Sequence, residues 1–265
     1  MLKALAIYPV FDHVTEYSAK WCKKLIEHLK SKCKVVEVGG RRVKREEVEG
    51  YIKGEDPYIV IFYDHGREGA WFGSEGEHVI DLRNVSLLSG RIAYSMSCRS
   101  AKILGREAFK KKCKVFVGYV EDFVFNVKDE EIFCRAVNYG LIIWLEGEED
   151  WINVKRKWID YWNKLIDEAD DPWTKMWLRH DRDSLRIIAE GVDEPETKCP
   201  ARKTAVKLFG SAGWRISRET AVSVLFFAVG FTMAVLDVSR VLGEIIMLFS
   251  YTTLIYEYLK LILNR

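Results

Sequence analysis

The sequence contains no glutamine and only five prolines among its 265 residues. Lysine, arginine and glutamate are abundant, a composition typical of heat-adapted intracellular proteins. The 41 basic and 39 acidic residues nearly cancel, so the net charge of +2 does not favour nucleic acid as a partner. Aromatic residues make up 13% of the chain and include nine tryptophans, which is enough for a substantial core.

No C-x-x-C pair occurs among the six cysteines, and their scatter suggests neither a zinc site nor a disulfide framework. The first apolar run, residues 2–10, is too short for a signal peptide, so we expect the thiols to face a reducing cytoplasm. No glycine-rich phosphate loop follows this run, which argues against nucleotide or flavin binding. A flavodoxin-like protein that binds a nucleotide or flavin is a further alternative, and a chromophore bound to the purified protein would support it.

Hydrophobic periodicity predicts strands and helices that alternate along the first half of the chain. This order indicates an α/β fold with a doubly wound, mainly parallel sheet flanked by helices. A tryptophan stripe within 151–169 is interpreted as core packing, and His180, in a run of Arg and Asp residues, as solvated surface. Strands are expected at 2–10, 35–38, 58–63, 92–96, 115–119 and 185–189, a small hairpin at 71–81, and helices at 16–31, 43–51, 100–112, 129–145, 151–169 and 173–179.

Two of the predicted strands end in residues suited to catalysis. Strand 58–63 leads into His65 and Gly66, and strand 92–96 leads into Cys98. Neighbouring parallel strands would deliver both blocks to one sheet edge, where open α/β sheets bind ligands. An imidazole there lowers the pKa of a thiol and carries its proton to the leaving group. The amides of Gly66 and Cys98 would form an oxyanion hole, which glycine favours because it has no Cβ.

A helix expected at 100–112 would begin beside the sulfur of Cys98. The positive end of its dipole would then stabilise the thiolate and the oxyanion.

The motif Y-D-H-G at 63–66 resembles the legumain and gingipain versions of the clan CD cysteine peptidases, and S-C-R-S at 97–100 is similar to caspase-like bacterial and archaeal peptidases. The likeness covers about the first 190 residues, although only these two blocks are specific. The resemblance implies a caspase-like fold and a cysteine endopeptidase that acts on polypeptides. It also implies Cys98 as nucleophile, His65 as general base and Gly66 as oxyanion donor, with no metal or organic cofactor.

Two acidic residues are expected beside this site. Asp12, after the first strand, would orient His65 or meet a basic substrate side chain; the alternative is that it only caps the next helix. The resemblance implies that the loop carrying Asp122 lines the pocket for the residue preceding the scissile bond. Together the two acids would favour Arg or Lys in that pocket. Met96, where several clan members carry a polar or acidic specificity residue, leaves the preference open, and no third catalytic group is evident.

Either block alone has a structural explanation. A His-Gly pair is a common turn, and a buried cysteine usually packs as a small hydrophobic residue. The alternative function is therefore a catalytically inactive caspase-like domain that serves as a membrane-tethered binding or signalling module.

The last 45 residues change character. Segments 220–236 and 241–263 approach the ~20 apolar residues that a membrane-spanning helix needs. Basic residues flank both outer ends, so the positive-inside rule predicts cytoplasmic ends and a cytoplasmic catalytic domain. A buried helical hairpin or a dimerisation pair is the alternative. The predicted organisation is a caspase-like α/β core at 1–145, a helical extension at 146–191, a linker at 192–218 and a two-helix transmembrane hairpin at 219–265.

The full chain is expected to sediment with membranes and to need detergent for extraction, because two apolar helices of about 20 residues would be buried in the bilayer. Fractionation followed by an alkaline wash measures this. Intact protein recovered in the soluble fraction without detergent would contradict the anchor.

Overall fold

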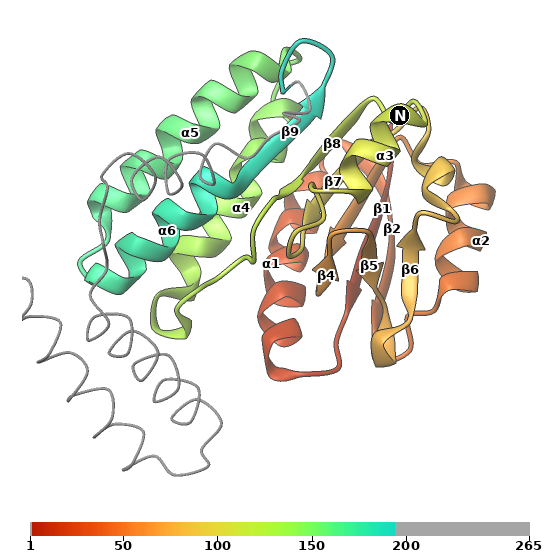
Figure 1. Cartoon of the computed structure of the whole chain (residues 1–265), viewed down its shortest axis with the longest axis horizontal. Coiled ribbons are helices and arrows are strands. Elements are labelled where there is room, and N and C mark those ends of the chain that lie inside the picture. Colours follow the sequence, from red (N-terminus) through yellow and green to blue (C-terminus); the bar gives the residue numbers. More distant parts are fainter. Residues whose placement is uncertain (1, 194–265) are drawn as a thin grey trace, which may run out of the picture. The chain divides into compact units, whose positions relative to one another are not determined.

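A computed structural model describes residues 2–193, and these fall within one compact unit. Strands and helices alternate through the first half, and helices dominate the second half (Figure 1). The strands are β1 (Leu2–Pro9), β2 (Cys33–Gly40), β3 (Ile59–Tyr63), β4 (Gly66–Arg67), β5 (Ala70–Phe72), β6 (His78–Asp81), β7 (Ile92–Met96), β8 (Val115–Tyr119) and β9 (Leu185–Ala189). The α-helices are α1 (His13–Leu29), α2 (Arg45–Glu55), α3 (Leu104–Lys110), α4 (Glu130–Leu145), α5 (Trp151–Glu168) and α6 (Pro172–Ser184).

The main sheet has six strands in the order β2-β1-β3-β7-β8-β9. All neighbours are parallel except β9, which pairs antiparallel with β8 at one edge. The expected α/β architecture with a mostly parallel sheet flanked by helices is confirmed, as is the last edge strand. This arrangement is compatible with a caspase-like fold.

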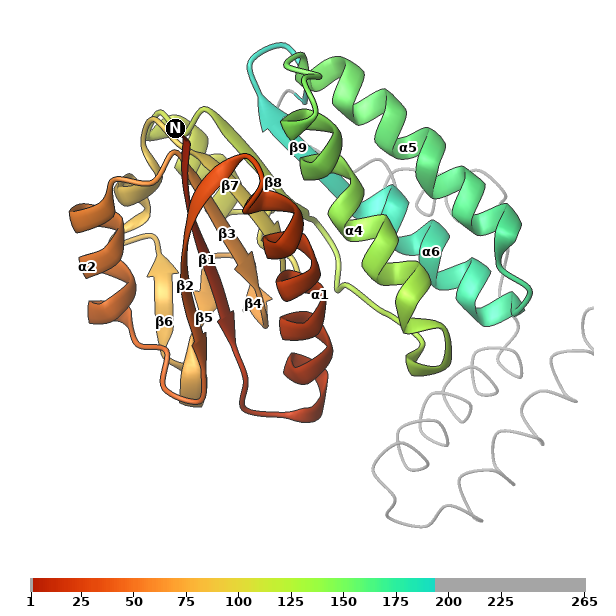
Figure 2. The same ribbon diagram turned by 180° about the vertical axis from the view of Figure 1, so that it is seen from behind.

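Side chains alternate between the two faces of the sheet and build two cores. One core lies between the sheet and α1, α4 and α5, and the other between the sheet and α2 and α3. Helices α4, α5 and α6 stack side by side beyond α1 (Figure 2). Since α4 and α5 share a core with the sheet, the expected helical extension at 146–191 lies in the same compact unit as the core.

The tryptophan stripe of α5 packs in the core, as expected. Trp158 and Trp162 are fully buried, and the Trp158 indole donates to the carbonyl of Ala136 at 2.7 Å. On the same side of the sheet, the buried Tyr63 hydroxyl donates to Asn138 of α4 at 2.6 Å. These bonds satisfy polar groups that burial would otherwise leave without partners.

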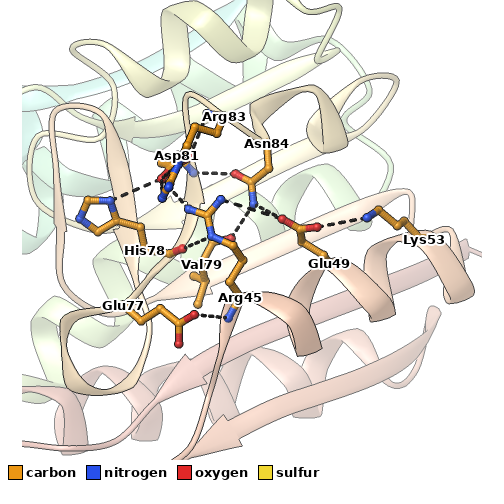
Figure 3. Close-up of polar contacts among 9 residues, drawn as sticks. All are labelled: Arg45, Glu49, Lys53, Glu77, His78, Val79, Asp81, Arg83 and Asn84. Atoms are coloured by element: carbon orange, nitrogen blue, oxygen red, sulfur yellow. Dashed lines mark hydrogen bonds and ion pairs between the residues drawn. The ribbon is translucent and has the colours of Figure 1, made fainter.

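A polar network fastens the small antiparallel sheet β4-β5-β6 to α2 (Figure 3). The guanidinium of Arg45, at the start of α2, contacts the Asp81 carboxylate at 2.5 Å, and Asn84 donates to Glu49 at 2.9 Å. Burial tends to raise the pKa of Asp81, but hydrogen bonds from Arg83 and Arg45 outweigh this effect and hold the pKa well below its usual range. The network matters for the candidate site because β4 begins directly after His65.

No helix within residues 2–193 is long and apolar enough to cross a membrane. The expected transmembrane hairpin at 219–265 and nearly all of the expected linker at 192–218 lie outside the described residues.

Replacing Gly140 by alanine is expected to destabilise the protein by about 1–3 kcal/mol, the usual effect of overpacking a core. A Cβ built on Gly140 lies 2.2 Å from the Trp158 ring, so α4 and α5 must separate. Gly50, within α2, faces open space and is the control. There the same substitution should stabilise by about 0.5–1 kcal/mol. Thermal unfolding of the two variants measures the difference; equal effects would contradict this packing.

Candidate active site

The ends of β3 and β7 bring the two predicted catalytic blocks together. The strands are parallel neighbours, and the register pairs Tyr63 with Met96. A Cβ built on Gly66 would lie 2.9 Å from the Cβ of Ser97, so the turn after β3 packs against the residue preceding Cys98. His65 and Cys98 therefore leave adjacent strand ends at one edge of the sheet, as the sequence predicted.

Asp12 both caps α1 and contacts His65, two of the three roles considered for it. One carboxylate oxygen accepts the Thr15 amide at 2.8 Å and caps α1, while the other lies 2.8 Å from Nε2 of His65. Burial tends to raise the pKa of Asp12, but hydrogen bonds from Thr15 and His65 outweigh this effect and hold the pKa below its usual range. An ionised Asp12, which follows the C-terminal end of β1, thus fixes the orientation of the imidazole.

Cys98 is partly exposed. Burial raises the pKa of its thiol, and the charges of Asp122 and Asp181 act in the same direction. A backbone hydrogen bond with Phe123 and the charge of Arg99 lower it. Within residues 2–193 the sulfur makes no hydrogen bond to the ring of His65, and because burial raises the pKa, the resting residue is a thiol at neutral pH.

The backbone around the sulfur offers two amides for an oxyanion. Because the Phe72 amide donates to the His65 carbonyl at 3.0 Å, Gly66 and Trp71 form a non-hydrogen-bonded pair, and the Gly66 amide points away from β5. The Cys98 amide donates to no group in the described part of the chain. Arg99 follows with a left-handed φ of 54°, a strained conformation that is typical of functional turns.

The helix expected at 100–112 starts later than predicted. Residues 98–103 form turns, and α3 begins at Leu104. The early amides bond elsewhere: Arg99 donates to Glu121, and both Ile103 and Leu104 donate to the Glu68 carbonyl. Since no helix begins beside Cys98, the prediction that a helix dipole stabilises its thiolate is wrong.

Asp122 lies in the loop after β8, where it was expected, but it has a partner. Its carboxylate forms an ion pair with Arg99, and both side chains are about half exposed, at 51% and 44%. The pocket that was expected to be acidic therefore carries its own positive charge.

Two buried carboxyls near the site escaped the sequence analysis. Asp181 of α6 is fully buried and accepts the Val124 amide at 3.1 Å through one oxygen, and the other oxygen has no partner within residues 2–193. It directly follows His180, which was interpreted as solvated surface and is partly exposed. The signal was helical spacing, because Asp181 follows the buried Thr174 and Leu178 on one face of α6. Asp64, after β3, is only 4% exposed.

A comparison with models of known protein families finds no match, and a comparison with curated proteins finds none either. Within residues 2–193, no three His, Cys, Asp or Glu side chains gather in a way that could hold a metal ion.

Replacing Asp12 by alanine is expected to cost about 1 kcal/mol of stability through loss of the helix cap, whereas asparagine keeps the cap. Because the pKa of Asp12 is lowered on folding, its carboxylate stabilises the protein above the unfolded-state pKa and ceases to do so as the pH falls through the folded-state pKa. The difference in stability between wild type and Asp12→Ala should therefore become smaller as the pH falls from 7 to ~3. Thermal unfolding at both pH values tests this; an unchanged gap would contradict it.

Proposed function

We propose that the protein is a cysteine endopeptidase of the clan CD type with a caspase-like fold. The observation that carries the proposal is the junction of β3 with β7, which sets His65 and Gly66 beside Ser97 and Cys98. The orientation of the His65 ring by Asp12 supports it further.

In the proposed reaction, Cys98 Sγ attacks the peptide carbonyl while His65 accepts the thiol proton. The carbonyl oxygen becomes an oxyanion that the amides of Gly66 and Cys98 stabilise. His65 then gives the proton to the leaving amine, and a water molecule hydrolyses the acyl-enzyme and regenerates the thiol. Asp12 is the third group that orients the imidazole and stabilises its protonated form.

The resting thiol requires a step before attack. Since burial holds Cys98 protonated, the proton must pass to His65 as substrate binds, and contacts of this kind often tighten only in the substrate complex. The peptidase domain is further proposed to be cytoplasmic and tethered to the membrane through residues 219–265.

The raised pKa of Cys98 favours a second candidate, a catalytically inactive domain that serves as a membrane-tethered binding or signalling module. A cysteine with a raised pKa and no hydrogen bond to the neighbouring histidine is also what a site without catalysis would contain.

A peptide acyloxymethyl ketone separates the two candidates, because it alkylates only a sulfur activated by a base. Wild type should be labelled, Cys98→Ala should not, and His65→Ala should react about 10²–10⁴-fold more slowly. Cys113→Ala, which removes another free but buried thiol, is the control and should label like wild type. Mass spectrometry locates the label. Equal labelling of wild type and His65→Ala would support the inactive module.

Fluorogenic peptides with Arg, Lys, Leu or Asp before the scissile bond test the proposed basic specificity. An exposed ion pair contributes only about 0–1 kcal/mol, so a substrate cation can displace Arg99 from Asp122. We expect the highest kcat/KM for Arg and Lys. Asp122→Asn should reduce that preference and Arg99→Gln should increase it. Cleavage only after Asp would overturn the basic preference.

A further inference from the structure

Asp64 is a buried acid without a basic partner at the centre of the candidate site. Its side chain is 4% exposed, its Oδ1 accepts the His65 amide at 2.5 Å, and its Oδ2 has no partner among residues 2–193. A buried polar atom left unpaired is uncommon and calls for a physical explanation. The mechanism proposed above does not use this group.

The backbone holds Asp64 against the end of β7. Its amide donates to the Met96 carbonyl at 3.3 Å, which continues the parallel register by one step beyond Tyr63. Asp64 is the first residue after β3, at a bend, and it is buried. The carboxyl is thus enclosed where β3 leads into the segment that carries His65 and Gly66.

The charges around Asp64 disfavour its ionised form. Asp12, in the turn before α1, acts on Asp64 through its charge, His65 follows it directly in the sequence, and no basic side chain in the described range bonds to it. Burial raises the pKa of Asp64 to about 9, and the charge of Asp12 acts in the same direction. Hence, while Asp12 is a carboxylate at neutral pH, Asp64 is a carboxylic acid.

We propose that Asp64 is a positioning residue that works as a neutral carboxylic acid: it holds the His65 amide, and so the turn that presents the Gly66 amide, without adding negative charge beneath the oxyanion. The effect on the reaction rests on the proposed function, whereas the neutral state and the hold on the turn do not. An ionised Asp64 would repel the oxyanion and the thiolate through a medium of low dielectric.

Three measurements on the full-length protein in detergent test the inference, with Asp64→Asn, Asp64→Ala and, as control, Asp183→Asn, which removes an exposed carboxylate of α6. The first is thermal stability against pH. Because folding raises the pKa of Asp64, wild type should lose stability as the pH rises from about 4 to about 9 relative to Asp64→Asn, and the gap should stay constant above that. The control should run parallel to wild type.

The second measurement is hydrogen exchange over residues 63–72. Asp64→Ala should exchange faster there because the His65 amide loses its acceptor, while Asp64→Asn, which keeps an acceptor oxygen, should match wild type. Parallel stability curves for wild type and Asp64→Asn, or unchanged exchange in Asp64→Ala, would overturn the inference.

The third measurement is peptidase activity against pH. Asp64→Ala should lose about ten- to a hundredfold in kcat with KM unchanged. Asp64→Asn should keep its kcat at pH 7 within about threefold and lack the alkaline fall that wild type shows near the pKa of Asp64. Full kcat in Asp64→Ala would overturn the positioning role. A wild type that cleaves nothing would overturn the proposed function, and the first two measurements would still decide the inference.

Discussion

The parallel pairing of β3 with β7 is the constraint on which the candidate site depends. Its register, with Tyr63 opposite Met96, sets where the two strands end and puts Gly66 against Ser97. A slip of one residue would move every side chain of a strand to the opposite face of the sheet. The buried aliphatic residues on both sides of this pair therefore hold the site in place as well as the fold.

Four aspartates lie around the two catalytic candidates, and their surroundings differ. Asp12 is ionised and holds the imidazole, and Asp122 is paired with Arg99. Within residues 2–193, Asp64 and Asp181 are buried without a basic partner, and burial raises the pKa of each. Burial thus favours the neutral form of Asp64 and Asp181, since desolvation and neighbouring charge decide the protonation state.

Much of the architecture follows from local patterns. The buried strands are continuous apolar runs, and the helices show one apolar face, so their existence and order were predictable. The two blocks at the strand ends led to His65, Gly66 and Cys98 for the same reason. The start of α3 was not predictable, because amides after Cys98 bond to the carbonyls of Glu68, Tyr119 and Glu121. These carbonyls lie far from the amides in the sequence. Local helix propensity was overridden by these tertiary contacts.

The sequence by itself determined which strands end in an imidazole and a thiol, because hydrophobic periodicity and the motifs at 63–66 and 97–100 are local properties. Only the tertiary structure decided the partners of three acids: Asp12 with His65, Asp122 with Arg99, and Asp181 with the Val124 amide. The physical reason is that these partners lie on chain segments far apart in sequence, and no local pattern encodes the distance between them.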